Sequence, residues 1–408
     1  MKDVRVLAIG DLANNSAKLK KYLKRSKIHL INFPWNTPSI VMDEKDDVEF
    51  FTSSYIPAQL KKINEVKDKY DICLAISPAG ARLAYLADLN YVIYFVGHDI
   101  RTPPFIKNVK DPFAFDKPVY SFNFFERRFY KSVYDMATAC VTTGHEAYSN
   151  LLKYRKDGIR IDHSIVDLSI FNSTIKPAER IKEKFTFFSP QRIGLFKGYD
   201  IILKALPLCK TEFEILQVNW FDKRNVDEEK FCNEFLDKIP QQIKLIPVMK
   251  RDDVAKYYMF ADAILGQMKV GNMGGIELEA GVMKKPVLCY YDPKMTYLID
   301  GKEITAPFLP NSRDPKELAQ LIDKIVLSEE FREDLAEKEH HFTKMLTDPE
   351  KTAAEWDNLF EKIFIKYKNI NRNSPTIIKK LRIYYFLITN RLYIKKFKKI
   401  FQNKTMRL

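Results

Sequence analysis

The chain has 408 residues, a net charge of +14 and 46% hydrophobic residues. This length predicts two domains, because single cores rarely grow beyond about 250–300 residues. The hydrophobic content excludes a disordered chain, and no stretch approaches the roughly 20 apolar residues that span a bilayer. The five cysteines form no Cys-x-x-Cys pair. Their odd number argues against a disulfide scaffold or a cysteine zinc site and favours a reducing compartment.

The charge is concentrated at one end of the chain. Residues 371–408 hold eleven Lys or Arg and no Asp or Glu, whereas the rest holds 56 basic and 53 acidic residues, a net charge of +3. We therefore expect an anionic partner to meet the C-terminal segment. At the other end, the apolar run Val4–Gly10 is too short and too interrupted for a signal peptide, so we expect a cytoplasmic protein.

The first half alternates short apolar runs with helical patterns. The expected strands are Val4–Ile9, Ile28–Phe33, Asp71–Ile76 and Tyr91–Val96, and the pattern continues through Tyr134–Thr142 and Ile159–Asp162. The expected helices are Ala17–Leu23 and Ala81–Leu89, the second of them after a turn at Ser77–Gly80. Strands that alternate with helices indicate a parallel sheet covered on both faces.

The same pattern restarts beyond about residue 176. The expected strands are Lys184–Ser189, Phe213–Val218, Ile243–Ile246, Ala263–Leu265 and Pro286–Leu288. The expected helices are Tyr199–Leu206, Asp252–Phe260, Gly275–Lys284 and Glu317–Val326. We predict two Rossmann-like, doubly wound α/β domains, 1–176 and 177–349, with a helix at about 350–370 crossing back to the first. A ligand is then expected in the cleft between them, outside the carboxyl ends of the strands.

Two basic residues follow the first expected strand of the second half. Arg192 and Lys197 lie five apart in a glycine-containing loop between that strand and a helix. Guanidinium and ammonium groups in this place can hold a diphosphate and offset the charge of a departing nucleotide. The alternative is a solvated loop with two ordinary basic residues.

A glycine-rich loop follows the expected strand Ala263–Leu265 and leads into a helix. Free backbone N–H groups at a helix N-terminus attract phosphate. The candidate donor-binding positions are Gly271, Asn272, Met273, Gly274 and Gly275. Glu279, one turn inside the helix, is a candidate acceptor of hydrogen bonds from ribose hydroxyls. Glu277 points to another face and is expected to be solvated.

In the first half, Gly97-His98-Asp99 directly follows the expected strand Tyr91–Val96. A histidine at that edge is placed to face the cleft and hydrogen-bond a sugar hydroxyl. A structural turn histidine is the alternative. The other histidines show no metal-ligand spacing.

Together these residues resemble the retaining glycosyltransferases of family four, which have the two-Rossmann-domain fold called GT-B. The resemblance rests on Arg192 and Lys197 with Gly198, on the Gly274 loop with Glu279-Ala280, and on Lys285-Pro286-Val287. Further similar stretches are Tyr257–Leu265, Ile161–Phe171, Gly97–Asp99 and Asp314–Ala319, so that about residues 4–360 are covered.

In that family an Arg and a Lys of the second domain bind the donor diphosphate, and a Glu-x7-Glu motif meets the sugar and the ribose. The resemblance implies a nucleotide-sugar donor linked to UDP or GDP, retention of the anomeric configuration, and no metal, because the basic residues replace it. It assigns catalytic roles to Arg192, Lys197 and His98. It also places the loop Gly10–Ser16, with Gly10 and Asp11, on the acceptor side.

One position departs from the family pattern. With Glu279 as the second glutamate, Gly271 stands where the first should be, and no acidic residue lies between Gly266 and Ile276. The first glutamate normally helps to hold the transferred sugar, so its absence bears on the sugar and on catalytic efficiency. The interdomain segment also departs, with Asp162-His163-Ser164 where Pro-Asn-Gly is usual, and we interpret this change as structural.

The basic segment 371–408 has an apolar stripe at helical spacing. Its members are Ile377, Leu381, Tyr384, Ile388 and Leu392, continued by Tyr393, Phe397, Ile400 and Phe401. A basic amphipathic helix rich in aromatic residues suits an anionic membrane surface. The alternative is a terminal helix packed on the body with solvated lysines. No RNA-binding signature accompanies the charge, so no nucleic acid is expected.

The sequence thus predicts a hexosyltransferase that uses a nucleotide-sugar donor and a lipid-linked or polysaccharide acceptor. We expect it on the cytosolic face of a membrane, in cell-surface polysaccharide or glycolipid assembly. Two alternatives stay open. One is a non-catalytic sugar-nucleotide-binding or scaffold subunit, which Gly271 favours. The other is a nucleotide-sugar epimerase of the same fold.

Overall fold

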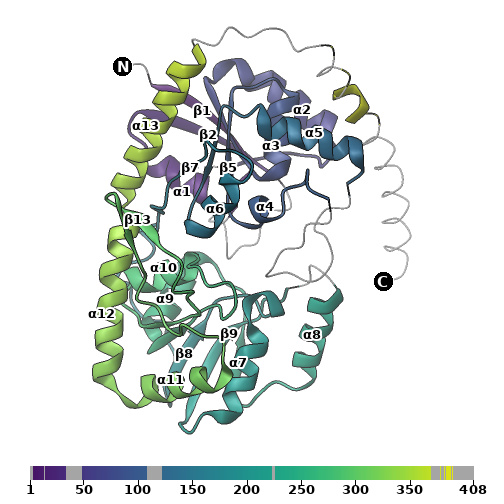
Figure 1. The fold of residues 1–408 in the computed structure, drawn as a ribbon. Helices are drawn as coiled ribbons and strands as arrows, with labels where there is room; N and C mark the ends of the chain where they lie inside the picture. Colours follow the sequence, from purple (N-terminus) through teal and green to yellow (C-terminus); the bar gives the residue numbers. More distant parts are fainter. Residues whose placement is uncertain are drawn as a thin grey trace.

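Two parallel sheets, each packed with helices, form the body of the molecule (Figure 1). The computed structural model describes residues 3–12, 14–33, 48–107, 122–222 and 226–368, and the single positions 377, 381, 383–386 and 388. Within this part of the chain, no helix is long and apolar enough to cross a membrane. The two α/β domains expected from the sequence are confirmed.

The first sheet has seven parallel strands in the order β3-β2-β1-β4-β5-β6-β7. They are β1 Val4–Ile9, β2 Ser26–Asn32, β3 Glu49–Phe50, β4 Ile72–Ile76, β5 Tyr91–Phe95, β6 Ala139–Thr142 and β7 Ile159–Arg160. The helices between them are α1 Asn15–Tyr22, α2 Ile56–Val66, α3 Ser77–Leu86, α4 His98–Arg101, α5 Phe124–Asp135 and α6 His145–Leu152. Strands β4, β5 and β6 are buried at every position, as a sheet covered on both faces requires.

The second sheet has five parallel strands in the order β10-β9-β8-β11-β12. They are β8 Phe185–Ser189, β9 Phe213–Val218, β10 Ile243–Ile246, β11 Ala263–Leu265 and β12 Val287–Leu288, and a hairpin of β13 Tyr297–Ile299 and β14 Lys302–Ile304 follows. The helices are α7 Tyr199–Ala205, α8 Val226–Asp237, α9 Arg251–Phe260, α10 Gly275–Val282, α11 Pro315–Leu327, α12 Glu329–Leu346 and α13 Pro349–Lys368. A short 3-10 turn, η2 Leu195–Lys197, precedes α7.

Helix α13 returns to the first domain. Trp356 and Phe360 are buried in one cluster with side chains of β1 and β4, and the Trp356 ring lies 5.2 Å from that of Tyr94 on β5. Figure 1 shows α12 along the second domain and α13 along the first. These two consecutive helices therefore join the domains on one side. The domain limits at 176 and 349 stay predictions, since the sheets themselves end at Arg160 and begin at Phe185.

Asp162 also joins the two domains. Its carboxylate accepts from the N–H of Gly144 over 2.7 Å and from that of Leu298, on the hairpin, over 2.6 Å. Arg160 pairs with Asp162 over 2.5 Å and donates to the carbonyl of Thr296 over 2.6 Å. In the segment that departs from the family pattern, Asp162 and His163 are buried, and these contacts give Asp162 a structural role, as expected.

Most expected elements are confirmed within one or two residues, but two interpretations are wrong. Ser77–Gly80 is the first turn of α3, with Pro78 in a position where its missing N–H costs nothing. A Cβ at Gly80 would stand 2.4 Å from the carbonyl oxygen of Ile9, so the glycine allows close packing on β1. Tyr134 belongs to α5 and packs its ring on Phe95, 5.3 Å away, so the strand begins only at Ala139.

Candidate functional site

The two motifs of the second domain are in direct contact at the carboxyl ends of β8 and β11. The N–H of Met268 donates to the carbonyl of Lys197 over 2.8 Å, and the Gln191 amide donates to the carbonyl of Gly266 over 2.8 Å. Gly198 has a φ of 75°, and a Cβ there would stand 2.7 Å from the carbonyl carbon of Met268. Glycine at 198 therefore lets two loops about 70 residues apart in sequence touch.

Arg192 and Lys197 are held beside aromatic rings at this contact. The Arg192 guanidinium lies 5.2 Å from the Trp220 ring, and its Nη1 is 3.9 Å from a carboxylate oxygen of buried Asp222. The Arg192 side chain is 29% exposed. The Lys197 ammonium lies 5.9 Å from the Phe196 ring. Cation–π contacts of this kind restrain a charge without neutralising it. A diphosphate at Arg192 would share the guanidinium with the Asp222 carboxylate.

Backbone donors of the same turn are already occupied by Glu228 of α8. This fully buried carboxylate accepts from the N–H of Leu195 over 2.6 Å and from that of Phe196 over 2.8 Å. A phosphate at η2 would therefore meet the side chains of Arg192 and Lys197 rather than these two N–H groups.

Gln267 supports the glycine-rich loop, and the sequence analysis did not identify it. Its oxygen accepts from the N–H groups of Lys269 over 3.0 Å and Val270 over 2.6 Å. Its nitrogen donates to the carbonyls of Asn272 and Tyr290, both over 3.1 Å. All four hydrogen-bonding sites of this buried amide are used. The available signal was a polar residue between an apolar strand and a glycine-rich loop.

The prediction that Glu277 is solvated is wrong. The side chain is buried, and it accepts from the N–H of Gly274 over 2.8 Å and from that of Gln267 over 3.2 Å. The N–H of Met273 donates to the Tyr297 hydroxyl over 3.2 Å. Met273 and Gly274 are thus not the free donors that we expected, because the Tyr297 hydroxyl and the Glu277 carboxylate already accept from them. A carboxylate at the third helical position also offsets the partial charge of the helix N-terminus.

Glu279 lies in a charged group that includes a residue of the first domain. One of its oxygens pairs with Arg251 over 2.5 Å, and the other accepts from the Tyr258 hydroxyl over 3.4 Å. The Arg251 guanidinium also lies 4.8 Å from the Phe171 ring. Lys18 of α1 interacts electrostatically with Arg251 and Glu279, and burial, followed by the charge of Arg251, lowers the pKa of Lys18 to about 8. A ribose hydroxyl at Glu279 would thus share the carboxylate with Arg251.

In the first domain, Gly10 and Asp11 form the loop at the carboxyl end of β1. Gly10 has a φ of 86°. Asp11 is buried and accepts from the N–H groups of Ser16 over 3.1 Å and Ala17 over 3.0 Å. Burial raises its pKa to about 6, although the hydrogen bonds from Ala17 and Ser16 favour the charged form. The Asp11 carboxylate thus stabilises the start of α1, and the loop itself lies at the sheet edge that we assigned to the acceptor.

His98 begins α4 directly after β5, while its side chain lies outside the described part of the structure. The neighbouring Asp99 is fully buried and accepts from the N–H groups of Val96 over 3.1 Å and Gly97 over 3.0 Å. The turn is therefore held by Asp99, and His98 stays a prediction from the sequence.

Gly271 has a φ of 81°, and its missing side chain leaves room for another residue. A Cβ there would stand 2.9 Å from both the Cβ of Asp292 and the Cε1 of Tyr290. The N–H of Asp292 donates to the Gly271 carbonyl over 3.0 Å. Asp292 lies in the loop after β12 and is not part of any motif predicted from the sequence.

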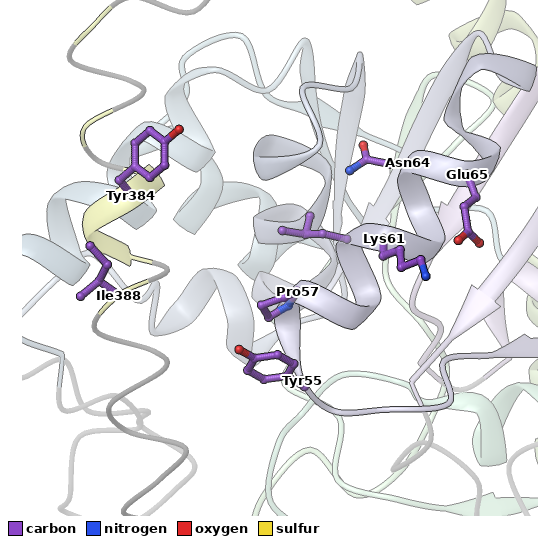
Figure 2. A pocket seen from close by; sticks show the side chains of 8 residues that line it. Tyr55, Pro57, Lys61, Asn64, Glu65, Tyr384 and Ile388 are labelled. Atoms are coloured by element: carbon purple, nitrogen blue, oxygen red, sulfur yellow. The ribbon is translucent and has the colours of Figure 1, made fainter.

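A separate groove of about 850 Å³ lies on the first domain, between α2 and the C-terminal segment (Figure 2). Tyr55, Pro57 and Lys61 line one side, and Tyr384 and Ile388 line the other. None of the predicted donor or catalytic residues is among those that line it.

Two parallel α/β domains, with basic and glycine-rich loops at the sheet edge of the second, form the GT-B fold that glycosyltransferases share. Residues 171–342 match the family model described as Glycosyl transferases group 1. No curated protein sequence matches the chain.

Solved structures agree on the fold. Sucrose-phosphate synthase from Thermosynechococcus elongatus superposes with a TM-score of 0.65 at 13% identity, over 89% of this chain and all of that one. HepE from Anabaena, in complex with UDP and glucose, gives 0.62 at 14% identity, over 88% of this chain and all of its own. A glycosyltransferase from Rickettsia africae gives 0.62 at 18% identity, over 91% of this chain and all of its own.

Proposed function

We propose that the protein transfers a hexose from a UDP- or GDP-linked donor to an acceptor hydroxyl, with retention of the anomeric configuration. The observation that carries the proposal is the contact between the loop of Arg192 and Lys197 and the glycine-rich loop. It puts two cations on the same sheet edge as the glycine loop, within the stretch that matches the group 1 family. HepE, which has a similar fold, binds UDP and glucose.

In this proposal the donor diphosphate lies against Arg192 and Lys197, which stabilise the negative charge that develops as the nucleotide leaves. These cations take the place of a metal ion. The ribose meets Glu279, and the acceptor hydroxyl approaches from the first domain, on the side of Gly10 and His98. Attack from the face that the nucleotide leaves retains the configuration.

We also propose that the acceptor is lipid-linked or a polysaccharide, and that residues 371–408 hold the protein on the cytosolic face of an anionic membrane. The described part of that segment supports this. Phe386 is buried and stacks on Phe129 of α5, with ring centroids 4.1 Å apart. Four members of the predicted stripe stay 60–77% exposed: Ile377, Leu381, Tyr384 and Ile388. Leu392 and the rest of the stripe lie outside the described residues.

Helix α5 extends this exposed apolar surface. Phe124 and Phe125 are each 57% exposed, and the Phe125 ring lies 4.8 Å from that of Tyr385. The Arg128 guanidinium lies 5.4 Å from the Phe124 ring. Phe386 agrees with the alternative of a helix packed on the body. The exposed aromatic residues beside cations favour a membrane, where apolar groups insert and cations meet lipid phosphates.

Ligand-induced thermal stabilisation tests the donor site. The purified protein is heated with UDP, GDP and their sugars, first without and then with magnesium. We expect one diphosphate nucleotide and its sugar to raise the unfolding temperature without metal, because a ligand of the native state stabilises according to its occupancy. The absence of any shift would contradict the proposal. Binding without turnover would favour a scaffold subunit, and conversion of the free nucleotide-sugar without acceptor would favour an epimerase.

Vesicle flotation tests the membrane surface. We expect the full chain to float with vesicles that contain phosphatidylglycerol and a protein ending at residue 370 to stay behind. The double variant Tyr384→Ser with Ile388→Ser, which leaves Phe386 docked, should also lose flotation. Leu327→Ser, at an apolar residue 75% exposed on α11, is the matched control and should float normally. Equal flotation of all four proteins would exclude this surface.

A further inference from the structure

We propose that Asp292 holds the sugar of the donor, through a hydrogen bond from a sugar hydroxyl to its carboxylate. This inference rests on the proposed function, because it names a residue for the sugar part of the same site. The first observation is the space beside Gly271. This residue has no side chain, and the side chain of Asp292 occupies the space instead.

The backbone attaches Asp292 to the glycine-rich loop. Gly271 and Tyr291 form an isolated parallel bridge, and the N–H of Asp292 donates to the Gly271 carbonyl over 3.0 Å. The Cβ of Asp292 then stands 2.9 Å from where a Cβ of residue 271 would be. The side chain of Asp292 therefore begins close to the place where a side chain at position 271 would begin, although the two residues belong to different loops.

A tight turn fixes the direction of this carboxylate. Its Oδ1 accepts from the N–H of Lys294 over 2.9 Å, and the N–H of Met295 donates to the Asp292 carbonyl over 2.8 Å. Among the described residues, no donor contacts Oδ2. The side chain is half-buried, so one oxygen is held by its own turn and the other is left to accept from a ligand. A hydrogen bond from a hydroxyl to a carboxylate is charge-assisted and stronger than one between neutral groups.

The loop of Asp292 also lies at the border between the domains. Four residues further on, the Thr296 carbonyl accepts from Arg160 of β7 over 2.6 Å, and its hydroxyl lies 3.2 Å from His145 Nδ1. A sugar that passes from a diphosphate on the second domain to an acceptor on the first must cross this border. The loop that carries Asp292 thus contacts the glycine-rich loop at one end and the first domain at the other.

The test compares ligands with and without the sugar. UDP-glucose, UDP-galactose, UDP-N-acetylglucosamine and GDP-mannose are each titrated beside the corresponding nucleoside diphosphate, by calorimetry, into the wild type and Asp292→Asn. The asparagine keeps an oxygen for the Lys294 N–H, so the turn is preserved. We expect about a tenfold or greater loss of affinity for the preferred nucleotide-sugar, and less than a twofold change for its nucleoside diphosphate.

The control is Asp300→Asn, at an exposed carboxylate of the β13–β14 turn that pairs with Lys351, and both affinities should stay unchanged. An equal loss for both ligands in Asp292→Asn would assign the residue to the loop structure alone and overturn the inference. No loss for either ligand would overturn it too. A wild type that binds none of the six ligands, the four nucleotide-sugars with UDP and GDP, would remove the donor site itself, and with it the role of Asp292.

Discussion

Position 271 requires glycine for two separate reasons, and both predict that a side chain there destabilises the protein. The backbone there has a φ of 81°, and a Cβ would collide with Asp292 and Tyr290. We expect Gly271→Glu to lose about 1–3 kcal/mol of stability through backbone strain alone, and to weaken donor binding. Chemical denaturation and donor titration measure both effects. A gain of transfer activity over an inactive wild type would contradict this and support a degenerate, non-catalytic site.

Arg192 and Lys197 are the residues on which the proposed chemistry most depends. Arg192→Ala and Lys197→Ala should each remove a charge-assisted contact to the diphosphate, worth about 1.5–3 kcal/mol of donor or transition-state binding. Initial rates over a range of donor concentrations give the effect on kcat/KM. The control is Lys230→Ala, at a 75% exposed lysine of α8. Wild-type rates in both variants would show that the assignment is wrong.

At this scale, the sequence predicted where the basic and glycine-rich loops lie, because each loop directly follows a strand. Arg192, Lys197 and the glycines follow apolar runs, and parallel strands bring such loops to one edge. The sequence did not predict the roles of Gln267, Glu277 and Asp292, because these roles depend on the packing of one loop against another. Glu277 shows the cause most clearly: helical geometry says where it points, but only the packing of the loop after β11 makes that direction a buried one.

The glycine-rich loop behaves as a single element held by one amide. Replacing Gln267 with Leu keeps the size of the side chain but removes partners from two N–H groups and two carbonyls. Each buried polar group left without a partner costs about 1–3 kcal/mol. We expect a lower free energy of unfolding and a loss of nucleoside diphosphate binding, measured by urea denaturation and calorimetry. A variant that is destabilised yet binds normally would show that the loop does not form the donor site.

Buried strands were the easiest elements to predict, since they are continuous apolar runs bounded by polar loops. Several helices were missed, among them α5, α8 and α12. Helix α5 carried a readable signal, because Asn123 and Glu126 form a reciprocal capping box at its start. Half of the residues of helix α12 are charged, and the helix buries Glu339, which accepts from the N–H of Val287 over 2.8 Å. A buried carboxylate on a charged helix cannot be distinguished from its solvated neighbours without the tertiary contact.

For the whole molecule, the relation of the domains depends on contacts that no local pattern contains. Arg160 and Asp162 join β7 to the β13–β14 hairpin, and Lys21 of α1 pairs with Asp167 over 2.7 Å. Lys18, one turn earlier on the same helix, interacts electrostatically with Arg251 and Glu279 of the second domain. The first domain therefore contributes a cation next to the carboxylate that we assign to the ribose.

This coupling predicts a pH dependence that spans both domains. Burial and the charge of Arg251 lower the pKa of Lys18 from 10.5 to about 8, against the attraction of Glu279, Asp11 and Asp167. Between these two values the folded protein binds fewer protons at Lys18 than the unfolded chain does. Stability from this group therefore rises as the pH rises through that interval.

Lys18→Met removes the titrating group, so the variant should be most stable relative to the wild type near pH 7. The difference should shrink or reverse towards pH 10, where Lys18 in the folded wild type has released its proton. Thermal unfolding of both proteins at matched ionic strength, from pH 7 to pH 10, measures this difference in stability. The control is Lys24→Met, at a lysine that is 70% exposed just beyond α1, and it shows the effect of losing a surface lysine. A difference that stays constant with pH would mean that Lys18 is solvated and that the two domains do not share this charge network.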